Sequence, residues 1–319
     1  MVWAIDRTAM ELGIKARRLM HNHPELENAE VLIFHCPFDC LMLEKVDKPS
    51  ILYEHLAARP VTFMFDEVIK RVDPIKRLIL IHDRPYVLEK FKWLFSLPDI
   101  IVCNSKFIRQ QMKEWFDIDA YVVYPPVNLK KFKPTTKNPK RTYFLSVQRV
   151  NWQKRIDLQI RAFAKTKEKL VIVGSIGEKV PNPDLKRLCS YYPNIEYVGP
   201  VSDRTLVKLY TNAKAVIQTG FYEDFGLVPV EGFACGTPAI VVDEGGFRET
   251  VHSPELGMRI KPPYEENLVK AVESFNPEDY DSERLREEAE KYSLERFKAE
   301  MEHYIDLAVK IHEGRKNKL

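Results

Sequence analysis

The sequence predicts an α/β protein built from two Rossmann-like domains, and three observations support this class. The chain has 319 residues, which is long for a single hydrophobic core. Short apolar runs rich in β-branched residues alternate with segments of helical periodicity, as in parallel α/β units. The alternation stops at a polar, proline-bearing stretch, residues 129–141, and then begins again. We therefore predict that this stretch is the linker between the domains.

The first half contains four segments that have the pattern of buried parallel strands. They are AEVLIFHC (29–36), PSILYEHL (49–56), PDIIVCNS (98–105) and AYVVYPPV (120–127). Between the last two, residues 106–116 place Phe107, Ile108, Met112 and Trp115 at helical spacing. We predict a helix there. Residues 1–135 form the expected N-terminal Rossmann-like domain.

The second half repeats this alternation over the expected C-terminal domain, residues 136–300. The predicted strands lie in 141–150, 169–175, 194–201, 214–220 and 238–246. Helices are predicted in 155–167 and in 202–213, where Ser202 has the position of an N-cap. An amphipathic helix closes the chain, and we expect residues 301–319 to pack back on the N-terminal domain.

Composition limits the function. A net charge of +3 and 45% hydrophobic residues fit a globular protein and give no reason to expect a nucleic-acid partner. The five cysteines are odd in number, and no apolar leader or membrane-spanning run is present. We therefore expect a cytoplasmic protein. Basic clusters such as 130–133 are most simply solvated surface, and peripheral contact with an anionic membrane is the alternative.

We expect no metal and no cofactor. The segment HCPFDC (35–40) holds two cysteines and a histidine but lacks the second half of a structural zinc site. The segment DID (117–119) resembles a metal-binding D-x-D motif, and we interpret it as a turn. The segment GSIGEK (174–179) follows a predicted strand without the spacing of a dinucleotide-binding loop, which disfavours a nicotinamide dehydrogenase.

Glycine and charge converge at the predicted strand ends of the second half. Ten of the 12 glycines lie between Gly174 and Gly257. In parallel sheets, ligands bind at the carboxyl ends of the strands. Arg149 and Lys154 follow one strand, and Gly174 and Ser175 follow the next. Two cations at a loop-to-helix junction suit a diphosphate, although a surface pair bound to nearby acids is the simpler alternative.

The segment EDFGLVPVE (223–231) has a carboxylate at each end of a glycine turn. We predict a helix that begins near Gly226, whose first N–H groups favour an anion. The glycine leaves room for phosphate or sugar to come close. Carboxylates accept hydrogen bonds from vicinal diols, so Glu223 and Glu231 suit the two sugar rings of a nucleotide sugar.

These motifs resemble the retaining glycosyltransferases of family four, which have the GT-B fold of two Rossmann-like domains facing across a cleft. The family's E-x7-E signature with its A-x-G-x-P continuation and glycine pair stands here as EDFGLVPVEGFACGTPAIVVDEGGFRET (223–250). Its R-x4-K pattern stands as RVNWQK (149–154). The amino-acid sequence of these motifs is most similar to that of polysaccharide mannosyltransferases. The resemblance implies transfer of a hexose, most simply mannose from GDP-mannose, to a glycan or lipid-linked acceptor without a metal.

The resemblance also implies residue roles. Arg149 and Lys154 would bind the diphosphate and stabilise the leaving group, and Glu223 would contact the transferred sugar. Further donor contacts are implied for Glu231 at the ribose and for the positions Phe225, Gly226, Leu227, Gly174 and Ser175.

The family places a histidine near the transferred sugar, within the context Y-x-H-x-P-x-R. YEHLAAR (53–59) supplies His55, with Ala57 where proline is usual, and His82 is a second candidate. The family also opens with a strand, a glycine pair and a helix, whereas Gly13 here lies in a helical pattern. A non-catalytic nucleotide-sugar-binding or scaffold subunit of a glycan-assembly system is therefore the alternative function.

Overall fold

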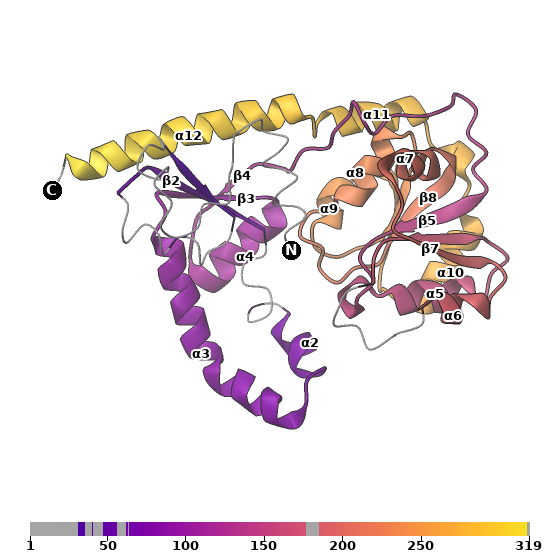
Figure 1. The fold of residues 1–319 in the computed structure, drawn as a ribbon, viewed down its shortest axis with the longest axis horizontal. Coiled ribbons are helices and arrows are strands. Elements are labelled where there is room, and N and C mark those ends of the chain that lie inside the picture. The colour runs from indigo at the N-terminus through magenta and orange to yellow at the C-terminus, as the bar shows by residue number, and fades with distance from the viewer. Residues whose placement is uncertain are drawn as a thin grey trace. The chain divides into compact units, whose positions relative to one another are not determined.

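The structure is a computed structural model that describes residues 31–35, 40, 47–55, 62, 64–176 and 185–317. The helical pattern around Gly13, the cysteine at position 36 and the residues 177–184 lie outside the described part. The chain divides into two compact units, Met1–Pro125 with Glu295–Leu319, and Pro126–Leu294. Figure 1 shows the elements of each unit.

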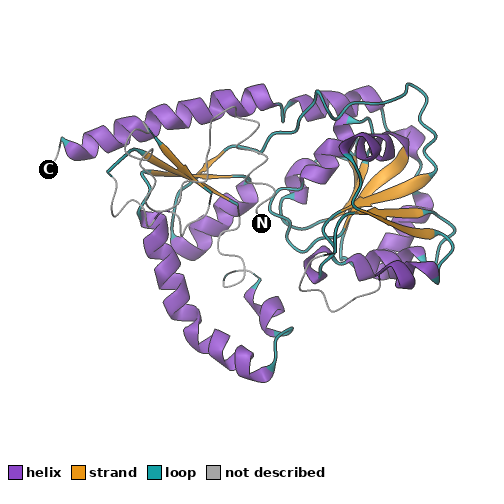
Figure 2. Ribbon diagram, viewed as in Figure 1, coloured by secondary structure: helices purple, strands orange, loops and turns teal. Residues whose placement is uncertain are grey.

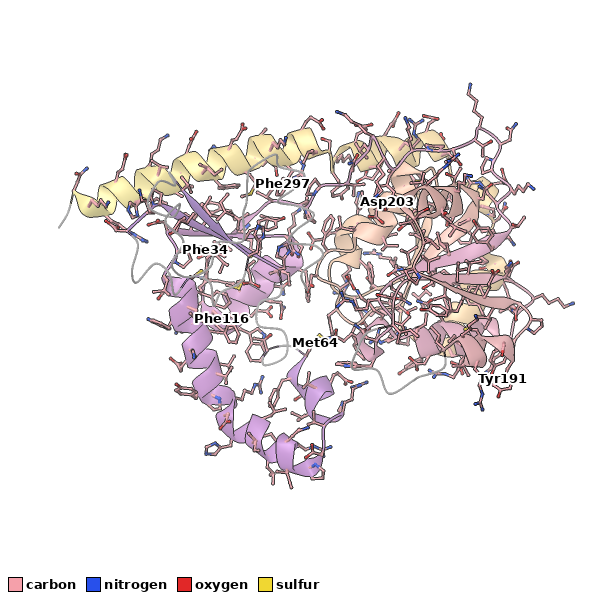
Figure 3. The ribbon with its side chains drawn as sticks, viewed as in Figure 1. Phe34, Met64, Phe116, Tyr191, Asp203 and Phe297 are labelled. Carbon is pink, nitrogen blue, oxygen red and sulfur yellow. The ribbon has the colours of Figure 1, made fainter. Side chains whose placement is uncertain are left out.

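The N-terminal unit contains a parallel sheet with the strand order β1-β2-β3-β4. Its elements are β1 (Leu32–Phe34), β2 (Ser50–Glu54), α2 (Phe65–Ile69), α3 (Pro74–Ser96), β3 (Ile100–Cys103), α4 (Lys106–Phe116) and β4 (Tyr121–Val122). The four strands and the helix 106–116 lie where the sequence predicts them. Phe34 and Phe116, which are labelled in Figure 3, are buried in one hydrophobic cluster, and Phe95 belongs to the same cluster.

The closing helix α12 (Leu294–Lys316) packs on the N-terminal sheet. Phe297, Met301 and Ala308 are buried in a cluster with Ile51 and Val102 of the strands. These three residues recur at helical spacing and form the apolar stripe that the sequence predicts. The observed unit boundaries lie after residue 125 and after residue 294, whereas the expected ones lay after 135 and after 300.

The stretch 129–141 is not a free linker, and this part of the sequence interpretation was wrong. Phe132 is buried and lies edge-on to Tyr210, with ring centroids 5.8 Å apart. The backbone N–H of Thr135 donates to the Thr211 hydroxyl. Arg141 donates through Nη2 to the Gly236 carbonyl and the Ser282 hydroxyl. The polar, proline-bearing stretch is therefore a loop that is attached to the rest of the C-terminal unit at several points.

The C-terminal unit contains a six-stranded parallel sheet with the order β10-β9-β8-β5-β6-β7 and helices on both of its faces (Figure 2). Its strands are β5 (Tyr143–Val147), β6 (Leu170–Val173), β7 (Ile195–Gly199), β8 (Ala213–Gln218), β9 (Ala239–Val242) and β10 (Gly257–Ile260). Its α-helices are α5 (Ile156–Phe163), α6 (Leu185–Ser190), α7 (Asp203–Asn212), α8 (Leu227–Ala234), α9 (Phe247–Thr250), α10 (Glu265–Ser274) and α11 (Ser282–Glu290). The short 3₁₀ helices are η4 (Trp152–Lys154) and η5 (Pro277–Asp279).

The sequence predicts most of this unit correctly. Ser202 is the N-cap of α7, and its hydroxyl accepts from the N–H of Thr205. The predicted strands 143–147, 170–173 and 239–242 are present, and their apolar side chains are largely buried. Because all six strands run parallel, their carboxyl ends lie along one edge of the sheet.

Asp99 joins α12 to the sheet of the N-terminal unit. Its carboxylate accepts from the backbone N–H and the hydroxyl of Ser50 at 2.8 and 2.9 Å. The same carboxylate pairs with Arg315 at 2.9 Å and contacts His312 at 3.2 Å, and its side chain is only 3% exposed.

We therefore expect Asp99→Asn to lower the free energy of unfolding by about 2 kcal/mol, because charge-assisted hydrogen bonds to a buried carboxylate are lost. Asp306→Asn, at an exposed position on α12, is the matched control and should change stability by less than about 0.5 kcal/mol. Urea unfolding of both variants makes the comparison. Equal stability of the two variants would contradict the role of Asp99.

Candidate functional site

The candidate site lies at the carboxyl edge of the C-terminal sheet. Strand β5 lies between β8 and β6, so the chain leaves β5 toward one side and later returns on the other side. In open parallel sheets, ligands bind at such a switch point, outside the carboxyl ends of the strands. The loops after β5, β8 and β9 carry the predicted cations, acids and glycines.

Lys154 and Glu223 meet at this edge. The Lys154 Nζ atom lies 2.5 Å from the Oε2 atom of Glu223. The two side chains are 23% and 21% exposed, so the pair is reachable from solvent. Lys154 ends η4, whose first turn is capped by the side chain of Asn151. The convergence of a cation from the β5 loop and an acid from the β8 loop is as the sequence predicts.

Arg149 is held at the same edge by its neighbours. The N–H of Gln148 donates to the carbonyl of Val173, and the N–H of Val150 donates to the carbonyl of Ser175. These two bonds fix the backbone on both sides of Arg149, whose side chain is exposed. Within residues 64–176 and 185–317, it forms no ion pair. Arg149 therefore remains available to an anion.

Gly174 is required by the backbone around Arg149. Its φ is +137°, and a Cβ atom there would lie 1.9 Å from the carbonyl oxygen of Gln148. The glycine thus permits the ends of β5 and β6 to approach one another. This packing reason for Gly174 was not part of the sequence interpretation. Its predicted contact with a donor remains a proposal.

Gly226 is the N-cap of helix α8, in agreement with a predicted start near this residue, and the structure adds a packing reason for the glycine. Its predicted contact with a donor remains a proposal. Its φ is +96°, and an added Cβ would lie 2.7 Å from the Phe247 ring. The glycine therefore allows the turn to pack on α9, and the space beside it is filled by protein. No side chain caps the helix. Because Pro229 has no N–H, the first-turn donors are those of Leu227 and Val228.

Glu231 is buried within α8, one turn past these donors. Its side-chain Oε2 accepts from the Tyr210 hydroxyl at 2.7 Å, and the residue is 7% exposed. Phe225 precedes the helix and is also buried, with its ring 5.5 Å from that of Tyr292. Glu231 and Glu223 thus differ in environment, since Glu223 is partly exposed and is paired with a cation.

The loop after β8 is fastened by residues that the sequence interpretation did not identify. The Thr219 hydroxyl donates to the carbonyl of Lys154, 2.9 Å away, and accepts from Gln159. Arg155 has a left-handed φ of +47° and forms two hydrogen bonds to Glu244, at 3.0 and 3.2 Å. Its guanidinium carbon also lies 3.3 Å from the centroid of the Phe221 ring. These contacts join the β5, β8 and β9 loops.

The glycine pair 245–246 lets the same loop lie close to β9. A Cβ on Gly245 would lie 2.5 Å from the carbonyl oxygen of Glu223, and the N–H of Gly246 donates to that oxygen. The pair was predicted at the sheet edge, and it positions the backbone of Glu223 there.

In the N-terminal unit, His55 directly follows β2, as the sequence predicts. Burial lowers the pKa of the imidazole to about 3. His82 has a different setting, since it lies within α3, is 88% exposed and contacts Asp83. No strand end positions His82, and the structure gives it no site.

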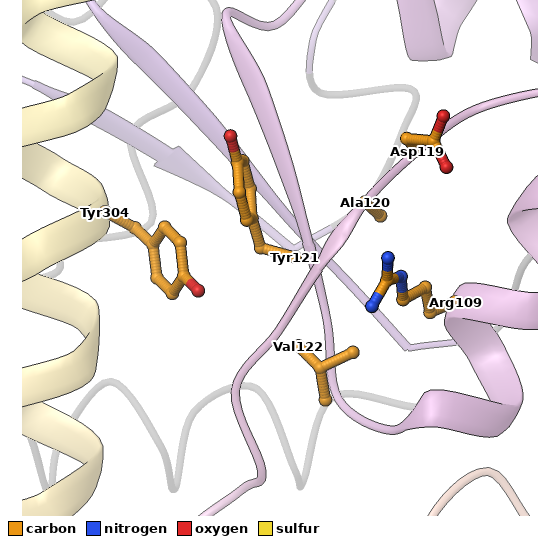
Figure 4. A pocket seen from close by; sticks show the side chains of 6 residues that line it. All are labelled: Arg109, Asp119, Ala120, Tyr121, Val122 and Tyr304. Carbon is orange, nitrogen blue, oxygen red and sulfur yellow. The ribbon is translucent and has the colours of Figure 1, made fainter.

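A separate pocket in the N-terminal unit contains none of the predicted site residues. Figure 4 shows its lining, which comprises Arg109, Asp119, Ala120, Tyr121, Val122 and Tyr304. Asp119, the last residue of the DID segment, is one of the lining residues. Lys113 forms ion pairs with Asp117 and Asp119. Among the described residues, no group of His, Cys, Asp or Glu side chains is placed to hold a metal ion. None of the described helices is long and apolar enough to cross a bilayer.

The fold and this edge define a protein of the GT-B type, and the comparisons with known proteins assign the family. Residues 127–292 match the family described as glycosyl transferases group 1, so the chain belongs to that family. Sucrose-phosphate synthase from Thermosynechococcus elongatus has a TM-score of 0.72 at 19% identity, over 88% of this chain and 74% of that one. The HepE protein of Anabaena, solved in complex with UDP, has a TM-score of 0.68 at 13% identity. The match covers 88% of this chain and 79% of HepE.

Curated relatives match part of the chain. The alpha-1,3/1,6-mannosyltransferase ALG2 of Kluyveromyces lactis is 29% identical over 282 residues, which cover 71% of this chain and 53% of the relative. The ALG2 protein of Saccharomyces cerevisiae is 27% identical over 219 residues, which cover 54% of this chain and 43% of the relative. The chain thus spans about half the length of these relatives.

The buried contact between Tyr210 and Glu231 can be tested by stability. Tyr210→Phe removes a hydroxyl that donates to a carboxylate, and we expect a loss of about 2 kcal/mol in the free energy of unfolding. Tyr143→Phe is the matched control, because that hydroxyl donates to the neutral carbonyl of Leu209. It should cost about 1 kcal/mol. Equal losses in urea unfolding would contradict a stronger hydrogen bond from Tyr210 to Glu231 than from Tyr143 to a backbone carbonyl.

Proposed function

We propose that the protein is a retaining hexosyltransferase that uses a nucleotide diphosphate sugar. The hexose is mannose, supplied by GDP-mannose, and the acceptor is a hydroxyl of a glycan or of a lipid-linked sugar. The observation that carries the proposal is the meeting of Lys154 and Glu223 at the sheet edge that also carries Arg149 and the uncapped start of α8. Family membership and the two ALG2 relatives support the reaction class and the choice of mannose.

In the proposed reaction, the bond between the anomeric carbon and the β-phosphate oxygen breaks. The acceptor oxygen forms its bond to the same face of that carbon. The acceptor proton passes to the leaving phosphate, and a nucleoside diphosphate departs. Negative charge grows on the phosphate as the first bond breaks, and preorganised positive groups stabilise such charge most strongly.

Each residue of the edge has a proposed role. Arg149 and Lys154 bind the diphosphate, together with the first-turn N–H groups of α8. Glu231 binds the ribose and Glu223 binds hydroxyls of the hexose. In the N-terminal unit, His55 is the residue proposed to contact a sugar hydroxyl. Because Lys154 already pairs with Glu223, donor binding must redirect the ammonium group from the carboxylate to phosphate oxygens. The metal-free reaction, the cytoplasmic location and peripheral contact with a membrane belong to the same proposal.

Substitution of the two cations tests the catalytic roles. Arg149→Ala and Lys154→Ala should each lower the rate of transfer on the order of 100-fold, because stabilisation of the leaving phosphate is lost. Arg161→Ala and Lys165→Ala, which remove exposed partners of Glu265 in the same unit, are the matched controls and should retain the rate. Radiolabelled transfer from GDP-mannose to a glycan or lipid-linked sugar acceptor provides the measurement. Wild-type rates in both site variants would refute the assigned roles.

A panel of donors tests the substrate class. Thermal unfolding would be followed with GDP-mannose, UDP-glucose, GDP and UDP, each with and without magnesium. A ligand present at 100 times its dissociation constant adds about 2.7 kcal/mol of stability, so the preferred donor raises the melting temperature by mass action. We expect the largest increase with GDP-mannose, independent of magnesium. Binding without turnover would favour the nucleotide-sugar-binding or scaffold subunit, and no shift with any nucleotide would refute the donor site.

A further inference from the structure

The carboxyl edge of the N-terminal sheet carries a connected set of neutral polar side chains. His35 follows β1, His55 follows β2 and Asn104 follows β3, and these three strands are neighbours in the sheet. The Nδ2 atom of Asn104 lies 3.3 Å from Nδ1 of His55. The Nε2 atom of His55 lies 3.5 Å from Nδ1 of His35. Three consecutive strand ends thus place their side chains in one line.

The direction of the hydrogen bonds in this line is set at the start of α4. Ser105 is the N-cap of that helix, and its hydroxyl oxygen accepts from the N–H of Ile108 at 3.1 Å. The hydroxyl hydrogen is therefore available to donate, and it is directed to Oδ1 of Asn104 at 3.2 Å. With Oδ1 as the acceptor, the amide presents its NH₂ group to His55.

The orientation of the Asn104 amide determines which nitrogen of His55 carries the hydrogen. A neutral imidazole has one donor and one acceptor nitrogen. Because the NH₂ group of Asn104 faces Nδ1, that nitrogen is the acceptor and Nε2 carries the hydrogen. The Nε2–H group then points toward His35 at a distance near the outer limit of a hydrogen bond. A closer oxygen atom of a ligand can therefore take its place.

The surroundings keep both imidazoles neutral. Asn104 and Ser105 are 5% and 0% exposed. Burial lowers the pKa of His55 to about 3 and that of His35 to about 4. The Tyr53 ring lies edge-on to both imidazoles, with centroids 4.8 and 5.8 Å away, and its hydroxyl is anchored on the carbonyl of Val123.

We propose that Asn104 is a positioning residue that fixes His55 in the tautomer with its hydrogen on Nε2, so that His55 acts as a neutral hydrogen-bond donor. The ligand group that it recognises is an oxygen acceptor such as a sugar hydroxyl. In this tautomer His55 cannot accept a proton through Nε2, which excludes it as the base for the acceptor hydroxyl. The tautomer follows from the N-terminal unit alone, and only the identity of the ligand rests on the proposed function.

The tautomer can be measured directly in the full chain. Two-bond ¹H–¹⁵N correlation spectra of ¹⁵N-histidine-labelled protein near neutral pH distinguish protonated from unprotonated ring nitrogens. His55→Gln identifies the His55 signals among those of the 8 histidines. We expect the ring of wild-type His55 to be protonated on Nε2 and unprotonated on Nδ1. Protonation on Nδ1, or a charged ring, would overturn the proposal without reference to any variant.

Asn104→Asp reverses the hydrogen bond, because a carboxylate only accepts. We expect the His55 hydrogen to move to Nδ1. Asn128→Asp is the matched control, since its side-chain oxygen accepts from the Lys131 N–H and a carboxylate can do the same. It should leave the His55 signals unchanged. An unchanged tautomer in Asn104→Asp would contradict the positioning role.

The transfer reaction adds a readout for the ligand. Asn104→Asp should lower kcat about 10-fold, through the loss of one hydrogen bond, while the KM for the donor changes little. An unchanged kcat would overturn the functional half of the proposal. A wild-type chain that holds hydrogen on Nε2 but transfers no sugar would instead refute the proposed function and uphold the tautomer.

Discussion

The candidate donor site depends on one constraint, the fastening of the β8 loop between the loops after β5 and β9. Parallel pairing of β5 with β8 and of β8 with β9 brings the three loops to one edge. Thr219 then ties the β8 loop to the backbone of residues 154 and 155, and Arg155 ties it to Glu244. The glycine pair at 245–246 removes the side-chain bulk that would keep the loops apart. The position of Glu223 beside Lys154 follows from these contacts.

Neighbouring cations at this edge differ in how firmly they are bound. Arg155 and Glu244 are 13% and 15% exposed and form a two-bond pair over an aromatic ring, which suits a structural role. Lys154 and Glu223 are more exposed and share a single contact, and such pairs contribute little to stability. Arg149 is exposed at a strand end. The cations assigned to the ligand are therefore those that can exchange their protein partners for phosphate oxygens most easily.

The sequence predicts regular elements well and predicts contacts between distant loops poorly. Apolar runs located the four strands of the N-terminal sheet and five strands of the C-terminal sheet, whereas β10 was not predicted. Local glycine and serine signals located the start of α8 near Gly226 and the N-cap Ser202. The linker prediction for 129–141 failed because Phe132 is buried against Tyr210, a contact that composition does not record. Arg155 was missed because its left-handed backbone and its partner Glu244 are not visible in a local pattern. Gly226 was found, but its close packing against the distant ring of Phe247 could not be predicted from a local pattern.

The strand-end edges of the two units, each taken by itself, offer different chemistry. The C-terminal edge presents full positive charges and backbone N–H groups, which suit a diphosphate. The described side chains after β1, β2 and β3 are two imidazoles and an amide, and burial lowers the pKa of both imidazoles. A charged donor beside a sugar hydroxyl would be costly to desolvate, whereas a neutral donor of fixed direction is not. Neutral donors of fixed direction therefore suit sugar hydroxyls, and the cations suit a leaving phosphate.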